Sequence, residues 1–242
     1  DLHIHSCLSP CGDDEMTVNN IVNMSIINNL DIIALTDHNS CKNCPAILKI
    51  AKEAGKLVIP GMELCTSEEI HVICLFPELE QAMAFDKYVY QNMPHIPNRK
   101  DIFGEQWILN EEDKIIDTEP FLLVTASDIS LEKLPNLMKE YGGLAIPAHI
   151  DKDSYSILAV YGFIPPELGF TAVEIAKPQP FLEKPFNQKQ IQGKRLISNS
   201  DAHYLWSIKE FSPDDQEEKQ IKDTMPLHAL SYNSLYNYLL GE

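Results

Sequence analysis

Short apolar runs that stop at a histidine or an acidic residue recur along most of the chain. The first reads Asp-Leu-His-Ile-His over residues 1–5, and later runs stop near residues 37, 63, 149 and 201. Period-two alternation in a short apolar segment is typical of a β-strand, so His3 and His5 are expected to point to the same side. Two adjacent imidazoles suit a divalent metal ion, because each offers one neutral nitrogen.

Helical segments of about ten residues lie between these runs. Strands are expected at 1–5, 32–35, 57–59, 70–76, 122–125, 144–146, 172–175 and 196–198, and helices near 17–29, 45–54, 80–91, 130–141 and 227–240. Strands that alternate with helices predict an α/β fold of parallel β-α-β units. Residues 77–120 break the alternation and include an expected hairpin at 107–116. We interpret them as an insertion or lid within a single domain that covers residues 1–242.

In parallel α/β folds the functional site forms at the carboxyl ends of the strands. The metal-competent side chains at or near these ends are His3, His5, Asp37, His38, Glu63, His71, His149, Asp201 and His203. His71 is an exception, because it opens its run. One histidine alone is more often structural than a ligand, but their recurrence at successive strand ends predicts a metal cluster.

Composition narrows the classes of function. No apolar run approaches the ~18 residues of a membrane span, so no membrane association is expected. The formal net charge of −17 makes binding to extended nucleic acid an unfavoured interpretation, since phosphate backbones attract clustered lysine and arginine. Six cysteines without a recognisable secretory signal predict reduced thiols and a cytoplasmic location. The oligomeric state cannot be predicted from these features.

Six motifs, in this order, resemble the PHP (polymerase and histidinol phosphatase) domain family of metal-dependent phosphoesterases. They are Asp1–His5, Thr36–Asn39, Pro60–Glu63, His71–Leu75, Pro147–His149 and Asn199–His203. The resemblance implies a distorted (β/α)7 barrel with two to three divalent ions in its mouth. It also implies three ligand sets: His3, His5, Glu63 and Asp201; Glu63, His71 and His149; and His38, His203 and an acid of the first loop.

The first-loop acid is the least defined ligand. Many family members place a Ser-Asp pair five residues after the second histidine, where this chain has Pro10. Asp13, Asp14 and Glu15 follow, and Asp13 is favoured because it comes directly after the flexible Gly12. The mixture of imidazoles and carboxylates fits Zn, Mn or Fe better than Mg or Ca.

The expected reaction is hydrolysis of a small-molecule phosphoester by a metal-bound hydroxide. The substrate classes considered are a mononucleotide, a nucleoside bisphosphate and a sugar phosphate. Asp201, Glu63 and His203 are the expected catalytic residues. Lys177 either contacts a non-reacting phosphate oxygen or is a surface lysine. The alternatives are an exonuclease that trims short oligonucleotides and a PHP module that binds metal without catalysis.

Four cysteines also follow the first two expected strands. Cys7, Cys11, Cys41 and Cys44 have the spacings Cys-x-x-x-Cys and Cys-x-x-Cys. Such a quartet could bind a separate Zn ion or an iron–sulfur cluster. The simpler interpretation is four reduced thiols in tight turns.

Overall fold

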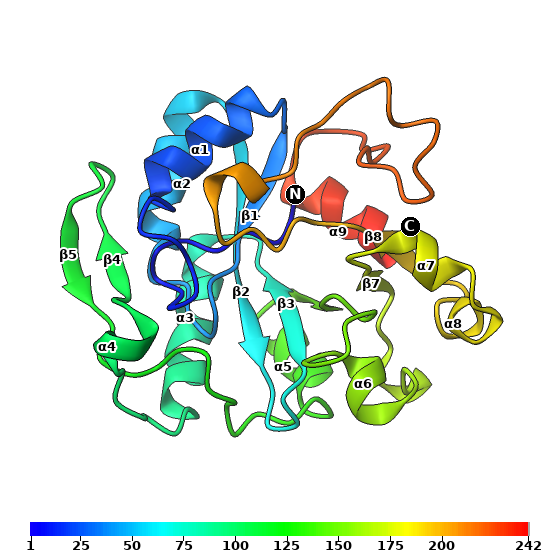
Figure 1. The fold of residues 1–242 in the computed structure, drawn as a ribbon, viewed down its shortest axis with the longest axis horizontal. Helices are drawn as coiled ribbons and strands as arrows, with labels where there is room; N and C mark the ends of the chain where they lie inside the picture. The colour runs from blue at the N-terminus through cyan, green and yellow to red at the C-terminus, as the bar shows by residue number, and fades with distance from the viewer. Residues whose placement is uncertain (242) are drawn as a thin grey trace.

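A four-stranded sheet forms the centre of the computed structural model, which describes residues 1–241 as a mixed α/β protein (Figure 1). Its strand order is β1-β2-β3-β6, with β1 at Ile32–Leu35, β2 at Leu57–Cys65, β3 at His71–Leu75 and β6 at Leu144–Pro147. Strands β1 and β2 are parallel, whereas β3 is antiparallel to both of its neighbours. The carboxyl ends of β2 and β6 therefore lie beside the amino end of β3.

The antiparallel β3 is a correction to the expected run of parallel units. Only residues 66–70 connect β2 to β3, and a parallel crossover needs a dozen or more residues. The tight connection pairs Cys65 with His71. His71 opens its strand and still stands at the same end of the sheet as Glu63, which explains the exception noted in the sequence.

Two further segments extend this arrangement. Strands β7 (Ala172–Glu174) and β8 (Arg195–Ile197) form a separate parallel pair. Residues 1–5 were expected to be a strand, but only Ile4 makes bridges, one to Leu35 and one to Ala202. The segment thus joins β1 to the chain after β8 through single residue pairs that do not continue into a ladder.

The expected (β/α)7 barrel is not confirmed by the strand pairing. Within residues 1–241 the ladders form three separate sheets and no closed barrel. Residues 122–125, expected to be a strand, form a turn. The inner core is nevertheless continuous, because one cluster of buried side chains draws on six strands (β1, β2, β3, β6, β7 and β8) and on helix α9 (Tyr232–Leu240). Its members are Leu2, Ala34, Ile59, Ile73, Leu75, Leu144, Ile146, Ala148, Ala172, Ile197, Leu235 and Leu239.

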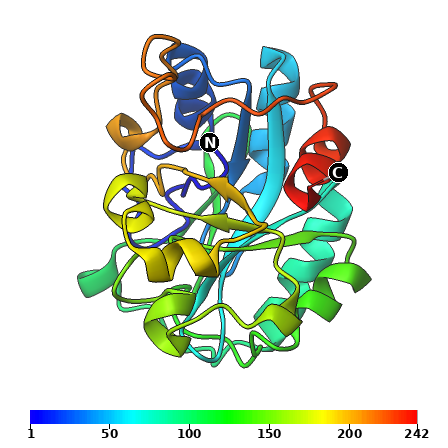
Figure 2. The same cartoon turned by 90° about the vertical axis from the view of Figure 1, so that its right-hand side faces the viewer.

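The helices lie around the strands (Figures 1 and 2). They are α1 (Val18–Ile27), α2 (Cys44–Ala54), α3 (Leu79–Gln91), α4 (Lys100–Phe103), α5 (Leu134–Glu140), α6 (Ile157–Tyr161), α7 (Pro178–Leu182), α8 (Pro185–Gln190) and α9 (Tyr232–Leu240), with short 3-10 turns η1 (Pro166–Leu168) and η2 (Leu205–Ser207). Thr17 caps α1 by accepting the Asn20 N–H, and α2 ends at Gly55 in the left-handed conformation. Figure 2 shows α9 (red) beside the sheet, where Leu235 and Leu239 pack on the inner core. Among residues 1–241, no helix is long and apolar enough to cross a membrane.

The expected hairpin within residues 77–120 is confirmed. Strands β4 (Trp107–Leu109) and β5 (Ile115–Thr118) are antiparallel and lie at the edge of the molecule near α2 (Figure 1). The Asn43 side chain ties this hairpin to α2, because it donates to the Trp107 carbonyl at 3.1 Å and accepts the Leu109 N–H at 2.8 Å. A role for residues 77–120 as a lid stays a prediction.

Candidate metal centre

Glu63 lies at the centre of the candidate site. Its side chain is buried at the carboxyl end of β2, and imidazole nitrogens surround both of its oxygens. The nearest distances are 2.9 Å to His71 Nδ1, 3.0 Å to His38 Nδ1, 3.1 Å to His149 Nε2, 3.3 Å to His3 Nε2 and 3.5 Å to His5 Nε2. One carboxylate thus faces five histidines from four separate parts of the chain.

Three groups of side chains place their ligand atoms within 4.8 Å of one another. They are His3, His5, Glu63 and Asp201; His38, Glu63 and His71; and His5, His38 and His203. The first group is the complete first ligand set implied by the family resemblance. The second group contains His38, Glu63 and His71. His149 contacts Glu63 Oε1, the oxygen that His71 also contacts. The three groups overlap at Glu63, His5 and His38, as expected of ions that share ligands.

The residues present fit divalent ions. Two ligand atoms at about 2.1 Å from one ion, with angles of 90–109°, lie about 3.0–3.4 Å apart. The spacings of the Glu63 oxygens from the surrounding nitrogens fall close to that interval. His38 Nδ1, His149 Nδ1 and Glu63 Oε2 are also buried without a hydrogen-bond partner. The His38 and Glu63 atoms are 3.0 Å apart but poorly aligned for a hydrogen bond, which a shared ion would account for.

Glu174 belongs to the candidate site, and the sequence analysis missed it. It is buried at the end of β7, and its carboxylate is 3.0 Å from His3 Nδ1. The same carboxylate also accepts the backbone N–H of His149 at 3.0 Å. If Nδ1 of His3 donates to Glu174, then Nε2 is free to bind a metal, an arrangement common around metal-binding histidines. The rule of acids at strand ends would have found Glu174 had it been applied to β7.

The charges of the cluster set the protonation of its members. Burial disfavours ionisation of Glu63, but His71, His3 and His38 hold its pKa well below the ordinary value. Burial likewise opposes ionisation of Asp201, and His3 and His5 lower its pKa. Both carboxylates therefore stay ionised near neutral pH and can act as metal ligands.

His5 is kept neutral. Burial, together with His203 and His38, lowers the pKa of His5 well below its ordinary value. Its Nδ1 lies 3.0 Å from the Ser9 hydroxyl, and its Nε2 lies 3.3 Å from Asp201 Oδ1. Metal binding requires the neutral imidazole, so this environment favours His5 as a ligand.

Asp37 is metal-competent in sequence but lies outside the three groups. Its carboxylate accepts the Ser6 N–H, the Ser6 hydroxyl and the Ser9 hydroxyl, each at 2.7 Å. Ser9 in turn accepts the His38 N–H at 3.1 Å. Asp37 thus holds the first loop against the histidines and does not project into the cluster.

The first loop does not bring an acid into the third group. The Asp13 carboxylate accepts the Glu15 N–H at 2.9 Å, and the Asp13 N–H donates to the His203 carbonyl at 2.9 Å. Cys11 comes closer to the cluster. Burial lowers the pKa of His38, but Glu63 and then the neighbouring Cys11 thiol raise it, and the net shift is upward. Asp13 as a ligand remains a prediction.

The four cysteines are not assembled into a metal site of their own. Within residues 1–241, the groups close enough to hold an ion contain no thiol. Cys41 is buried and donates to the Gly61 carbonyl at 3.2 Å, and Cys44 is also buried. Cys7 is buried while Cys11 is exposed. All four are free thiols, as the simpler interpretation expected.

Lys152, rather than Lys177, reaches the centre. Lys152 Nζ is 2.5 Å from Asp201 Oδ2. Burial disfavours its charge, but Asp201 raises the pKa of Lys152 overall. Lys177 is exposed, and its backbone N–H donates to Asp151 at 2.7 Å. Lys152 follows His149 by three residues, a position that sequence spacing alone does not distinguish from a surface lysine.

Several residues around the centre have a strained backbone. Asn39, His149, Tyr155 and Asp201 have φ angles of 49°, 29°, 54° and 52°. Positive φ values are uncommon outside glycine and cluster at functional sites, where surrounding contacts hold them. Asn39 shows such contacts, because its amide donates to the Leu123 and Thr125 carbonyls at 2.7 and 2.8 Å.

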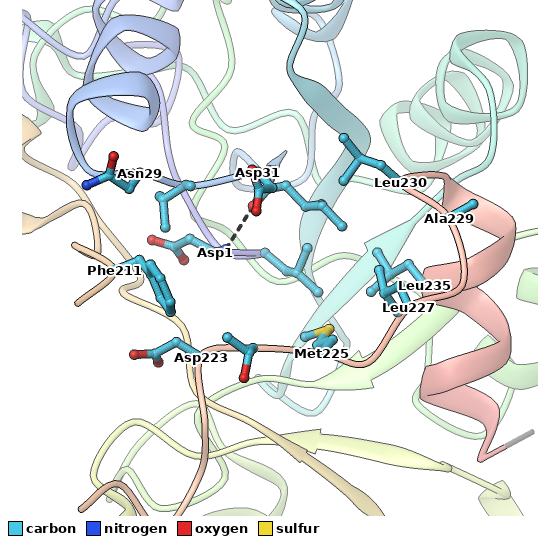
Figure 3. Close-up of a pocket in the computed structure, with 14 residues that line it drawn as sticks. Asp1, Asn29, Asp31, Phe211, Asp223, Met225, Leu227, Ala229, Leu230 and Leu235 are labelled. Carbon is cyan, nitrogen blue, oxygen red and sulfur yellow. Dashed lines mark hydrogen bonds between the residues drawn. The ribbon is translucent and has the colours of Figure 1, made fainter. Parts of the chain in front are cut away.

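A separate cavity of about 320 Å³ lies at the other end of β1 (Figure 3). Asp1, Asp31 and Asp223 contribute carboxylates to its wall, and Phe211 and Met225 contribute apolar surface. Its lining includes Ile32, which begins β1, whereas His38 follows the opposite end of that strand. This cavity is not part of the candidate metal centre.

Fold and site together define a mixed α/β protein with a buried His/Glu/Asp centre at one end of its strands. The PHP domain model matches residues 1–139. This match covers more than half of the chain, and the chain therefore belongs to the PHP domain family. The resemblance inferred from the ordered motifs is confirmed.

Solved structures of similar fold include two kinds of protein. The lesion-specific endonuclease EndoQ of Pyrococcus furiosus has a TM-score of 0.64 and 16% identity, over 100% of this chain and 55% of that one. Endonuclease Q bound to a 27-mer duplex with an abasic lesion has a TM-score of 0.56 and 18% identity, over 85% of this chain and 49% of that one. A putative metal-dependent phosphoesterase of Bifidobacterium adolescentis has a TM-score of 0.58 and 13% identity, over 99% of this chain and 94% of that one.

These likenesses concern the fold. The chain spans about half the length of the endonuclease Q structures and nearly the whole of the Bifidobacterium phosphoesterase. The comparison with curated proteins found no match.

Proposed function

We propose that this protein is a metal-dependent phosphoesterase that hydrolyses the phosphoester of a small molecule. The observation that carries the proposal is the Glu63 carboxylate, buried among five imidazoles and shared by two of the three ligand groups. Membership of the PHP family supports the same chemistry. We further propose that the strands enclose a distorted barrel, an arrangement supported by the inner core to which all six strands contribute.

The proposed ligand roles follow the three groups. His3, His5 and Asp201 would hold one ion with Glu63, while His71, His149 and His38 would hold a second ion with the same carboxylate. His203 would hold a third, looser ion with His5 and His38, because its side chain is 22% exposed and belongs to one group only. The donor set fits two to three Zn, Mn or Fe ions.

The remaining steps fall to the protein's own residues. Divalent ions bound there would lower the pKa of a coordinated water and offset the charge of the phosphoester. Asp201 is ionised, and its Oδ1 faces His3 and His5 while its Oδ2 faces Lys152. It can therefore orient the attacking water and accept a hydrogen bond from it. Lys152 can leave Asp201 to contact a non-reacting phosphate oxygen.

A panel of phosphoesters tests the proposal. Protein reconstituted with Mn or Zn is expected to hydrolyse at least one of a nucleoside monophosphate, a nucleoside bisphosphate, a sugar phosphate and a chromogenic phosphomonoester. Activity should vanish with chelator, return with metal, and rise with pH through neutrality. Because His3 and His5 lower the pKa of Asp201, that carboxylate is already ionised, and the rise does not report its titration.

The panel has clear negative outcomes. Activity that survives complete metal removal would exclude the proposed chemistry. No turnover of any phosphoester by protein shown to hold at least two metal equivalents would favour the non-catalytic PHP module instead.

A nuclease is the second candidate function, and the fold of endonuclease Q favours it. The acidic composition does not exclude it, since a site that takes one or two terminal nucleotides needs little basic surface. Short single-stranded oligonucleotides and a duplex with an abasic site belong in the same panel. Release of mononucleotides or strand cleavage at rates above the monoester rate would assign this second function.

The two lysines give a matched pair of variants. Lys152→Met is expected to lower kcat/KM by about 10- to 150-fold, because a charge-assisted contact to phosphate contributes about 1.5–3 kcal/mol. Lys177→Met should change it less than about twofold, since that side chain is exposed and has no contact with Asp201. Steady-state kinetics with metal content measured alongside checks this. Equal losses, or a larger loss for Lys177→Met, would contradict the assignment.

A further inference from the structure

Tyr155 is an exposed aromatic residue fixed beside the candidate metal centre. Its ring stacks on His71, with centroids 4.7 Å apart and planes inclined by 29°. Its backbone carbonyl also accepts the His71 N–H at 2.9 Å. Tyr155 is 45% exposed, so contact with His71 leaves part of the ring open to solvent. A flat apolar surface therefore stands next to a residue that also contacts Glu63.

The loop that carries Tyr155 is held in place at several points. We call residues 149–156 the site loop. Lys152 N–H donates to the His149 carbonyl at 2.9 Å, and the Ser156 hydroxyl donates to the Lys152 carbonyl at 2.7 Å. The same hydroxyl accepts the Ala159 N–H and caps α6. These bonds tie the loop to α6, while the His71 N–H and the stack on the His71 ring hold Tyr155, whose φ is positive, in place before any ligand arrives.

The site loop combines two recognition groups. Lys152 places a cation against Asp201, and Tyr155 places a ring against His71. A phosphate attracted to the cation and the metal centre would leave its organic group near the loop. A planar organic group gains more from an open tyrosine face than a sugar does, because aromatic rings stack in offset geometry over and above the area they bury.

We propose that Tyr155 stacks a nucleobase, so that the phosphoester hydrolysed at this centre belongs to a nucleotide. The nucleotide is either free or the terminal residue of a short strand, and its chemistry at Tyr155 is the same in both cases. This inference rests on the proposed phosphoesterase function and narrows its substrate class. Stacking of one base on an aromatic side chain typically contributes about 1–3 kcal/mol.

The test assays three variants, each on substrates that carry a base and on a substrate that lacks one. Tyr155→Leu removes the aromatic ring but keeps apolar volume, Tyr155→Phe keeps the ring, and Tyr161→Leu is the control. Tyr161 is on α6 and is 37% exposed, which makes it a matched surface tyrosine. The substrates are a nucleoside monophosphate, a dinucleotide and ribose phosphate, with metal content measured for every variant.

Tyr155→Leu is expected to lower kcat/KM by about 5- to 150-fold for the base-bearing substrates, chiefly through KM. For ribose phosphate, Tyr155→Leu should change kcat/KM less than about twofold. Tyr155→Phe and Tyr161→Leu should have kcat/KM values close to those of the parent on every substrate. A greater loss on the dinucleotide indicates a strand terminus, and a greater loss on the monophosphate indicates a free nucleotide. Equal losses with and without a base would overturn the proposal, because Tyr155 would then only position His71.

Calorimetry separates this inference from the proposed function. Metal-loaded parent protein is titrated with a nucleoside monophosphate and with inorganic phosphate, and the titrations are repeated with Tyr155→Leu. A nucleotide that binds more tightly than phosphate in the parent, but not in the variant, supports base stacking even if no substrate turns over. Equal affinity for the two ligands in the parent overturns it, even if phosphoesters are hydrolysed.

Discussion

Glu63→Gln is expected to lose more bound metal and more catalytic activity than any other single substitution at the centre. The amide keeps the shape of the side chain but removes its charge and replaces one oxygen with an N–H donor. Five imidazole nitrogens within 3.5 Å of this carboxylate would then lose the anion that they share. Loss of residues that merely support metal ligands typically costs 10–100-fold, and loss of a shared ligand is expected to exceed about 100-fold in kcat/KM.

His203→Ala is the comparison for that variant. His203 belongs to one ligand group, stacks on His5 with centroids 4.2 Å apart, and is partly exposed. Its loss is expected to release at most one metal equivalent and to leave the other two groups intact. Elemental analysis of both variants, dialysed against metal-free buffer, measures this difference. If His203→Ala lost as much metal as Glu63→Gln, a bridging role for Glu63 would be wrong.

Removing the metal ions is expected to lower the thermal stability of the folded protein substantially. Ligands that bind only the native state stabilise it by about 2.7 kcal/mol at one hundred times the Kd. For a chain of this size each kcal/mol shifts Tm by roughly 2–4 °C. Each tightly held ion should therefore raise Tm by about 5–10 °C. The cause is local, because Glu63 and five histidines are buried together at the candidate centre.

Thermal unfolding before and after chelation measures this effect. Restoring Mn or Zn to the parent should recover the original Tm, whereas Glu63→Gln should show a smaller shift at the same metal concentration. Lys177→Met, whose side chain is exposed and outside the cluster, should behave as the parent does. An unchanged Tm in protein shown to have lost all of its metal would count against buried ions at this centre.

The sequence by itself determined the family, the mixed α/β class and most of the candidate ligands. Histidines and acids near successive strand ends indicated the candidate ligands, because the carboxyl ends of parallel strands lie at a common edge. His3 and His5 needed only the two-residue period of an extended chain, and their Nε2 atoms lie 3.2 Å apart in the structure. These features depend on short segments, which the sequence describes directly.

Only the tertiary structure decided which strands pair and which side chains contact one another. The direction of β3 depends on which strands pair with it, and that pairing brings His71 to Glu63. Asp37 accepts hydrogen bonds from the hydroxyls of Ser6 and Ser9, which are distant from it in the sequence and close to it in the fold.

The contacts made by Glu174 and Lys152 likewise depend on the tertiary structure. Glu174 reaches His3 across 171 residues of chain, and Lys152 reaches Asp201 across 49. Local pattern reports the direction of a side chain relative to its own strand. It does not report which side chain from another strand will compete for the same hydrogen bond or the same charge, because that choice depends on packing between segments that are far apart in the sequence.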